Sequence, residues 1–400
     1  MTLKRSSQLA LASAMSLLAA GLLTACGTLT VDFVFVTSAK ASGANNYGLI
    51  DVFEVNSESG RMKHIPTSPF PSGGRNPVAE ATSPDNTSLY VVNEDDNTIV
   101  QFAIGNDGKV YPQNTTNTPG IFPLAVSVGG NLLFEASTYQ QLPSCSPASP
   151  CSGAIGVFPI KAGNVLGDAL TNASINANYW PLSLPSSTGD ILTPTGITAA
   201  ASGAYVYVSA VDSTSSAGYV FSFAVNADGT LTPLNGGAPF AAGKRPSAIA
   251  ANSGGSVVYV TDSTSNGVFA FSSNAGILTP IGGSPFPSGN GPDAIVVDAS
   301  GNYVFVANAL DSNLTAYSSS GGALASLGTY ATGTQPSAIG IDPSLNQYLY
   351  TANFLGSSVT GFQINGSTGA LLNSQGSPYG ANANPTAVAA IPHGAVQNEH

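Results

Sequence analysis

Short apolar runs alternate with polar turns along most of the chain, and the pattern repeats. The stretch "RPSAIAANSGGSVVYVTDSTSNGVFAF" begins at Arg245, and related stretches begin at Gly291 and Gln335. Each contains an apolar run opened by proline, a second run ending in Asp or Asn, and a third run with alternating polarity. A fourth run follows a turn, as in "DGTLTPL". Runs of this length, rich in β-branched residues and bounded by Gly and Pro, predict β-strands.

The repeat has a regular period. The proline that opens the first run recurs at Pro77, Pro123, Pro194, Pro246, Pro292, Pro336 and Pro385. Most intervals are close to 45 residues, and four short strands in such a unit are typical of one β-propeller blade. Helical solenoids have similar periods, but the density of Gly, Pro and β-branched residues excludes them. The fold class predicted is therefore all-β.

The two ends of the repeat array predict how the ring closes. The array begins with "VDFVFVTSAK", which aligns with a second strand, and ends with "PTAVAAIP", which is a lone first strand. We expect these ends to pair in one sheet, which removes the exposed edges of an open array. The prediction is a seven-bladed propeller over residues 31–392, with four antiparallel strands per blade and a C-terminal tail at 393–400.

The N-terminus is typical of export. Lys4 and Arg5 precede an apolar run that is too short to span a bilayer comfortably. The run closes on "LTAC", which resembles a bacterial lipobox. This predicts a signal peptide at 1–25, lipidation of Cys26, and a tether at 26–30 that links the protein to a membrane. The alternative is an ordinary cleaved signal with an incidental cysteine. Gly27 slightly favours the outer membrane, with a periplasmic or cell-surface location.

Two further cysteines, Cys145 and Cys151, lie six positions apart in the loop "SCSPASPC". In an exported protein this spacing predicts a local disulfide. A zinc site is not expected, because no histidine or further cysteine lies nearby to complete four ligands.

Composition limits the classes of partner. Only 8% of the residues are charged, and loss of Lys4 and Arg5 with the signal takes the formal net charge from −11 to −13. Nucleic-acid binding is excluded because no basic stripe is present. Disorder is excluded by a hydrophobic content of 43%. We expect a monomer that needs no cofactor or metal and binds a polar or anionic small molecule or a protein.

The repeats "PSAIA…VYVTD" and "PSAIG…LYTAN" and the connectors "GGSPF" and "GGAPF" resemble the lactonase family of seven-bladed propellers. That family includes 6-phosphogluconolactonases and carboxymuconate-cyclising enzymes. The repeats are also similar to the YVTN propeller repeats of bacterial surface proteins. The resemblance covers nearly all of 31–392 and implies the fold. Its motifs are packing motifs, so no catalytic residue is carried over from it.

In a propeller blade, the loop before the first strand and the hairpin between the second and third strands lie at the same mouth of the channel. The predicted ligand-binding residues at this mouth are Arg75, Lys244, Arg245, Asn93, Asp262, Asn308 and Asn353. Arginine can hold a carboxylate or phosphate in a bidentate manner. For the Asn and Asp residues, the alternative is that they hydrogen-bond turn backbone. Turn chemistry does not explain Arg75 or Arg245.

The interval from Pro123 to Pro194 carries about 23 extra residues, in the cysteine loop and around Trp180. We expect both segments beside the same mouth, where Tyr179 and Trp180 could cover a bound ring. Alternatively these aromatic residues pack on the neighbouring blade.

Catalysis at this mouth would need a carboxylate base, because no histidine is expected there. His64 falls in an outermost strand, His393 at the opposite mouth and His400 at the terminus. Glu94 and Glu135 are the candidates. Glu135 replaces an apolar residue of a second strand, so it is either buried with a raised pKa or turned outward by a register slip. Two functions remain open: ligand binding without turnover, and lactone hydrolysis with Arg75 or Arg245 stabilising the oxyanion.

Overall fold

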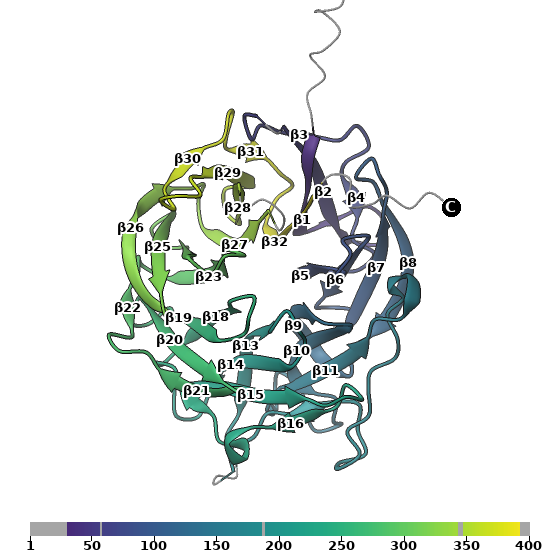
Figure 1. Cartoon of the computed structure of the whole chain (residues 1–400). Coiled ribbons are helices and arrows are strands. Elements are labelled where there is room, and N and C mark those ends of the chain that lie inside the picture. The colour runs from purple at the N-terminus through teal and green to yellow at the C-terminus, as the bar shows by residue number, and fades with distance from the viewer. Residues whose placement is uncertain (1–29, 57, 186–188, 343–346, 393–400) are drawn as a thin grey trace, which may run out of the picture.

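Seven four-stranded blades surround a central channel (Figure 1). The computed structural model describes residues 30–56, 58–185, 189–342 and 347–392. The blades are numbered along the chain. Blade 1 contains β32 (Pro385–Pro392), β1 (Thr30–Ser42), β2 (Tyr47–Asn56) and β3 (Met62–His64), with β4 (Phe70–Pro71) beside β2. Blade 2 contains β5 (Pro77–Thr82), β6 (Ser88–Asn93), β7 (Thr98–Ile104) and β8 (Val110–Asn117). Blade 3 contains β9 (Gly120–Gly129), β10 (Leu132–Gln140), β11 (Ala154–Pro159) and β12 (Trp180–Pro181).

The remaining blades repeat this order. Blade 4 contains β13 (Leu192–Ala199), β14 (Tyr205–Asp212), β15 (Ala217–Val225) and β16 (Leu231–Pro233), with β17 (Phe240–Ala241) beside β15. Blade 5 contains β18 (Pro246–Ala251), β19 (Val257–Asp262), β20 (Gly267–Asn274) and β21 (Ile277–Pro280), with β22 (Phe286–Pro287) beside β20. Blade 6 contains β23 (Pro292–Val297), β24 (Tyr303–Asn308), β25 (Asn313–Ser320) and β26 (Ala323–Ala331). Blade 7 contains β27 (Pro336–Ile341), β28 (Tyr348–Asn353), β29 (Ser358–Ile364) and β30 (Leu371–Asn373), with β31 (Tyr379–Gly380) beside β29.

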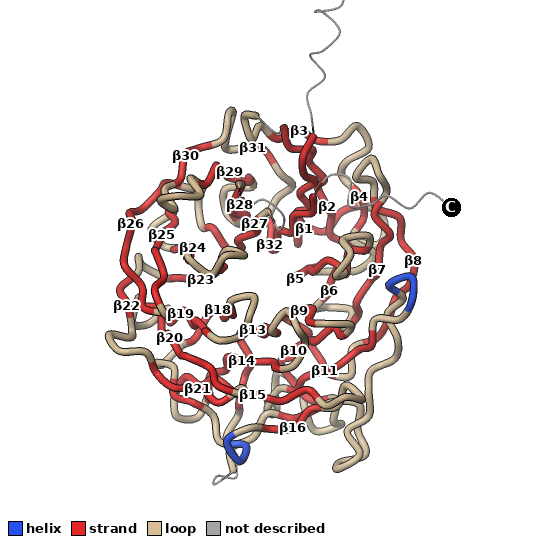
Figure 2. Tube along the Cα trace, viewed as in Figure 1, coloured by secondary structure: helices blue, strands red, loops and turns tan. Residues whose placement is uncertain are grey.

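The seven-bladed, all-β prediction is confirmed. In the described part of the chain the only helices are two short 3-10 turns, η1 (Ala162–Asn164) and η2 (Asn235–Gly237), drawn in blue in Figure 2. None of the described helices is long and apolar enough to cross a membrane.

The ring closes as predicted, because the C-terminal β32 pairs antiparallel with the N-terminal β1. The register places Phe35 opposite Ala389 and Asp32 opposite Pro392. Blade 1 therefore combines one strand from the end of the chain with three from its beginning, and this closure leaves no unpaired first or second strand.

The core is distributed around the ring. One hydrophobic cluster lies at each of the seven interfaces between neighbouring blades. Successive residues of a strand point to opposite faces of its sheet, so each blade contributes one alternate set of side chains to each neighbour. This packing holds the loops at the two mouths in fixed positions.

Candidate functional site

The loops before the first strands and the hairpins after the second strands meet at one mouth of the channel, here called the upper mouth. The backbone N–H of Ser263 donates to the carbonyl of Arg245 at 3.0 Å, and that of Phe354 donates to Gln335 at 2.8 Å. Glu94 donates to Asn76 in the same way at 3.0 Å. A repeated backbone bond thus joins the two predicted sets of loops in each of these blades.

Asp262 is a structural residue of this mouth. Its buried carboxylate accepts the backbone N–H groups of Lys244 and Arg245, each at 2.6 Å, and those of Thr264 and Ser265. Burial alone would raise the pKa of Asp262, but these N–H groups outweigh burial and hold the pKa below its ordinary value. The carboxylate therefore fixes the loop that carries Lys244 and Arg245.

Asn308 and Asn353 are also buried and committed to the protein. The Asn308 amide donates to the Thr315 hydroxyl at 2.8 Å, and the Asn353 amide donates to the Thr360 hydroxyl at 3.0 Å. Asn308 also accepts the Gly289 backbone N–H at 3.1 Å, which is the turn role that was the alternative to ligand binding, whereas Asn353 bonds only to the side chains of Thr351, Ser358 and Thr360 within the described residues. Asn93 is buried as well, but neither polar atom of its side chain has a partner in the described part of the chain.

Val100 explains why the Asn93 side chain lacks the hydrogen bond that Asn308 and Asn353 make. Val100 lies seven residues after Asn93, at the position that Thr315 and Thr360 hold after their asparagines. Valine has no hydroxyl to accept the amide, so the hydrogen bond seen in blades 6 and 7 is missing in blade 2.

The two predicted arginines are in different environments. The Arg75 side chain is half exposed and binds Asp96, with Nη2 2.6 Å and Nε 2.7 Å from Oδ1. The hydrogen bond and charge of Asp96 raise the pKa of Arg75. Arg245 is exposed, and its guanidinium makes no hydrogen bond or ion pair within the described residues. Arg245 is therefore the arginine that is available to a ligand.

Asp293 was not identified from the sequence, although it lies near Arg245. It follows the proline of β23, where blades 4, 5, 7 and 1 have a threonine or serine. Its side chain keeps an exposed surface, although β23 packs against β18 and β27, the first strands of the neighbouring blades. Restricted hydration raises the pKa of Asp293, and the charge of Arg245 partly opposes the rise. The departure from Ser/Thr was the signal that could have identified it.

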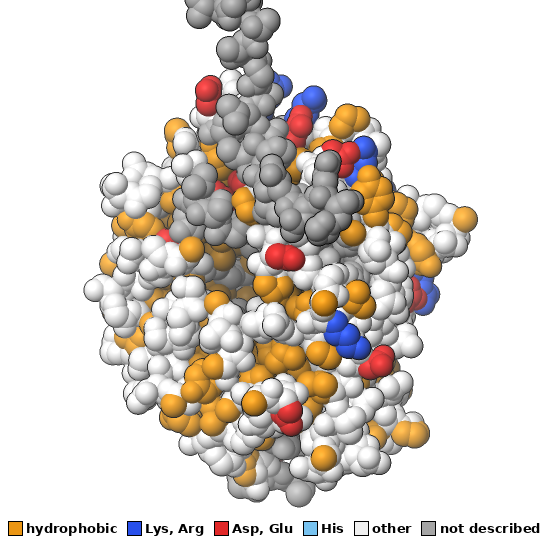
Figure 3. All heavy atoms as spheres, turned by 45° about the vertical axis from the view of Figure 1, so that its right-hand side comes forward, with side chains coloured by type: hydrophobic (Ala, Val, Ile, Leu, Met, Phe, Trp, Pro, Cys, Tyr) orange, Lys and Arg blue, Asp and Glu red, His pale blue; other side chains and the backbone are white. Residues whose placement is uncertain are grey.

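Charged side chains lie singly or in small groups on the face shown in Figure 3. Among the described residues no three His, Cys, Asp or Glu side chains are grouped as metal ligands. The arrangement at Arg245 can bind an anion or an oxyanion through the cation, while Asp293 can exchange a proton.

The model of the family "Lactonase, 7-bladed beta-propeller" matches residues 33–174 and 273–389. The chain belongs to the lactonase family. No curated protein matches by sequence.

Solved structures show the same fold as this lactonase-family chain at low sequence identity. A candidate 6-phosphogluconolactonase from Bacteroides fragilis has a TM-score of 0.70 and 19% identity, over 91% of this chain and 99% of that chain. The periplasmic gluconolactonase of Pseudomonas aeruginosa has a TM-score of 0.69 and 17% identity, over 90% and 99%. At these identities the likeness establishes the fold and not the reaction.

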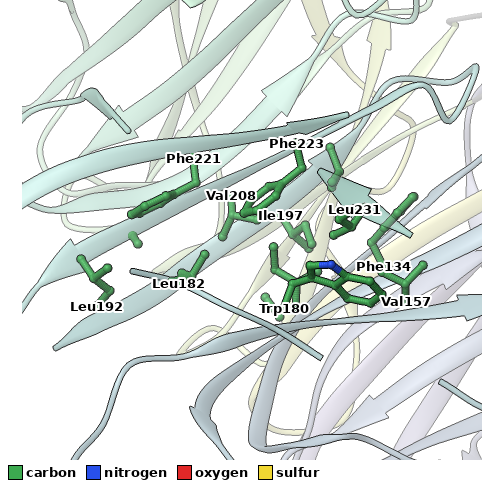
Figure 4. Packing of buried hydrophobic residues seen from close by; sticks show 14 residues of the cluster. Phe134, Val157, Trp180, Leu182, Leu192, Ile197, Val208, Phe221, Phe223 and Leu231 are labelled. Carbon is green, nitrogen blue, oxygen red and sulfur yellow. The ribbon is translucent and has the colours of Figure 1, made fainter. Parts of the chain in front are cut away.

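Trp180 is not at the mouth of this lactonase-family propeller. It is 4% exposed and packs with Phe134, Ile197 and Phe223 between blades 3 and 4 (Figure 4). The structure thus has the packing arrangement that was the alternative to ligand contact. The cysteine loop does follow the upper end of β10, and Cys145 and Cys151 form the predicted disulfide, with Cα atoms 5.5 Å apart.

The catalytic candidates are less accessible than Asp293. Glu94 accepts a hydrogen bond from the Asn76 amide at 2.6 Å, and its pKa is raised by burial and by the neighbouring Asp95. Glu135 is completely buried, so the register slip does not occur. One of its oxygens accepts the Ser137 hydroxyl, the other has no partner among the described residues, and burial raises its pKa to about 8.

Glu80 is a second glutamate with an enclosed carboxylate, although the residue as a whole is only partly buried, and sequence reasoning missed it. It occupies the fourth position of a proline-led strand, which is Ile or Val in the other blades. Burial raises its pKa to about 8, and the Ala389 amide of blade 1 partly opposes the rise. Glu80 pairs with Val91, whereas Glu135 pairs with Val126 at the equivalent register of the next blade. Neither glutamate interacts with Arg245, so both lie outside the Arg245–Asp293 site.

His64 is the one histidine among the described residues. His64 ends the outermost β3, where its ring lies edge-on to Phe53 at 4.1 Å. His393 and His400 lie outside the described residues, as does Cys26.

Proposed function

We propose that the protein binds a polar, anionic small molecule at the upper mouth, with Arg245 as the principal contact. The observation that carries this proposal is the exposed guanidinium of Arg245, whose side chain makes no hydrogen bond or salt bridge in the described part of the chain. Lys244 is exposed beside it, and Asp262 holds both backbone positions in place. Arg75 is a weaker candidate because Asp96 already binds it.

A thermal-shift measurement with D-gluconate and 6-phosphogluconate tests this binding. At about 100-fold excess over its dissociation constant, a ligand stabilises the folded protein by roughly 2.7 kcal/mol. Arg245→Ala should remove most of the shift while leaving the ligand-free melting temperature unchanged. Lys63→Ala, at an exposed lysine of outermost β3, is the matched control. A shift that persists in Arg245→Ala, or no shift with either acid, would contradict the proposal.

Lactone hydrolysis is the second function we propose, and Asp293 is the observation that favours it. A carboxylate can take a proton from water as the water oxygen attacks the lactone carbonyl. The ring C–O bond then breaks, and the leaving alkoxide takes up the proton to give a hydroxy acid. The guanidinium of Arg245 is suited to stabilise the oxyanion that forms between these steps. Membership of the lactonase family supports this chemistry.

Alkali consumption during ring opening of D-glucono-δ-lactone measures this reaction. We expect Asp293→Asn to lower the rate at saturating lactone by at least about 100-fold, and Arg245→Ala to lower it together with binding. Binding without any rate above the uncatalysed reaction leaves the recognition function and excludes hydrolysis of this lactone. Turnover that is unchanged in Asp293→Asn would exclude Asp293 as the base.

We further propose that Cys26 anchors the protein outside the cytoplasm. β32 runs from Pro385 at the upper mouth to Pro392 at the opposite mouth, and Asp32 pairs with Pro392. Four residues from Cys26 to Thr30 span at most about 14 Å. A lipid on Cys26 would therefore keep the opposite mouth near the membrane and turn the upper mouth away from it. The Cys145–Cys151 disulfide supports export, because disulfides form and persist mainly in oxidising compartments outside the cytoplasm.

A further inference from the structure

A cavity lies at the outer rim of the ring, between blades 2 and 3. It has a volume of about 680 Å³, within the usual range for small-molecule sites. One wall is the end of β8, the outermost strand of blade 2, which pairs with β7 on one side and has a free edge on the other. The other wall comes from the segment before β12 and from the loop after β10. We call this cavity the rim groove.

The rim groove is lined by neutral polar side chains. Asn114 and Asn117 lie on β8, and Gln141, Asn176 and Asn178 lie on the opposite wall. No lysine or arginine lines it, and its single charged group is the exposed carboxylate of Asp168. Anionic ligands are therefore disfavoured, and the small apolar surface disfavours hydrophobic ones.

Several of these groups are available for binding. The side chains of Asn117, Gln141 and Asn176 are exposed and make no hydrogen bond within the described residues. A carboxamide carries a donor and an acceptor side by side, so it can bind two neighbouring hydroxyl groups of a sugar. Several carboxamides on facing walls therefore match a chain of vicinal hydroxyls.

The wall that carries Asn176 and Asn178 is held in shape before any ligand arrives. The Asn172 N–H donates to the Ala177 carbonyl at 2.7 Å, and the Thr171 hydroxyl donates to Asn178 Oδ1 at 3.0 Å. Trp180 follows and is buried between blades 3 and 4, which fixes the end of the segment. Preorganisation of this kind lowers the entropy lost on binding.

An extended peptide is the main competing ligand, because β8 has a free edge. However, Pro112 lacks an N–H, and the pairing of β8 with β7 is irregular between Pro112 and Asn114. Only a short regular stretch remains beside the rim groove, and the opposite wall is loop rather than strand. Side chains therefore offer more hydrogen bonds to a ligand than the strand edge does.

We propose that the rim groove is a second ligand site that binds a neutral oligosaccharide. It is separate from the upper-mouth site and does not depend on the function proposed there. The extra residues between Pro123 and Pro194 form one of its walls, so this insertion would serve to bind the saccharide. Trp180 holds the end of the insertion in place by packing between blades 3 and 4.

Calorimetric titration of the purified full chain with maltohexaose, cellohexaose and hexa-N-acetylchitohexaose tests the proposal. We expect saturable binding of at least one of them, weakened roughly tenfold or more by Asn117→Ala and by Asn176→Ala. Asn302→Ala is the matched control, because it removes an exposed carboxamide that has no side-chain hydrogen bond in blade 6. Arg245→Ala should also leave saccharide binding unchanged, which separates this result from the upper-mouth proposal.

Melting temperatures of the variants verify that each one is folded. No binding of any hexasaccharide at millimolar concentration would overturn the proposal, as would equal affinities in the wild type and both groove variants. A neutral acetyl-(Thr-Asn)₃-amide peptide is titrated in parallel. Binding of the peptide in place of the saccharides would overturn the ligand class.

Discussion

Replacing Glu135 by glutamine should make the folded protein more stable at neutral pH. Glu135 is fully buried on the face of blade 3 that packs against blade 2, and one carboxylate oxygen has no partner in the described chain. Burial raises its pKa from 4.5 to about 8. The folded protein therefore keeps this carboxyl protonated at pH 7, whereas the unfolded chain ionises it.

The pH dependence follows from this difference. Below about pH 4.5 both states hold the proton, so Glu135 adds no dependence there. Between pH 4.5 and about 8 only the folded state holds it, so the free energy of unfolding falls by about 1.4 kcal/mol per pH unit. At pH 7 the free energy of unfolding is therefore about 3 kcal/mol lower than it would be without the titration of Glu135. Glutamine does not titrate, so Glu135→Gln should escape this loss.

Urea unfolding of the wild type and Glu135→Gln at pH 5, 6, 7 and 8 measures the effect. The difference in unfolding free energy should be small at pH 5 and grow steadily in favour of the variant. Asp32 and Glu80, whose pKa values are also raised by burial to about 8, are present in both proteins and cancel in the difference. Glu58→Gln, at an exposed position, is the control. A difference that does not change with pH, or a less stable variant at pH 8, would refute the reasoning.

Three other changes test the loops and the tether. Asp262→Ala should destabilise the protein by about 3–5 kcal/mol in urea unfolding, because four backbone N–H groups lose their buried acceptor, and Asp262→Asn should cost less; equal stability of Asp262→Ala and the wild type would exclude the structural role. Reduction of Cys145–Cys151 should lower stability by about 2–3 kcal/mol without unfolding the ring, since the loop is short; an unchanged melting temperature on reduction would contradict this. Cys26→Ala should move the protein from the membrane to the soluble fraction or leave an uncleaved precursor, and intact mass showing an unmodified N-terminus at another residue of the wild type would exclude the anchor.

The repeat was sufficient to predict the ring, because proline-led strands and polar strand ends report local geometry that every blade shares. The pairing of β32 with β1 also followed from the sequence. The first unit lacks its first strand, and the last unit consists of a first strand alone, so the two ends complete one blade. The sequence left Glu135 open between a buried and an outward position, and the structure shows that it is buried.

The site was predicted less well. Whether a side chain is free to contact a ligand depends on contacts between loops, and the repeat does not encode these contacts. Arg75 and Arg245 are similar in sequence context, but of the two only Arg75 forms a salt bridge with an aspartate, Asp96. Asp293 and Glu80 each depart from the residue that other blades have at the same position, so comparison of every repeat position would have identified both. Trp180 was ambiguous because an aromatic residue in an insertion can pack inward or remain exposed.

Calorimetric titration of D-gluconate into the wild type, Arg75→Ala and Arg245→Ala is the most direct test of ligand binding at the upper mouth. We predict one saturable site per chain in the wild type, retained in Arg75→Ala and lost or weakened at least tenfold in Arg245→Ala. Equal affinity in all three proteins, or a loss confined to Arg75→Ala, would contradict the assignment of the site to Arg245.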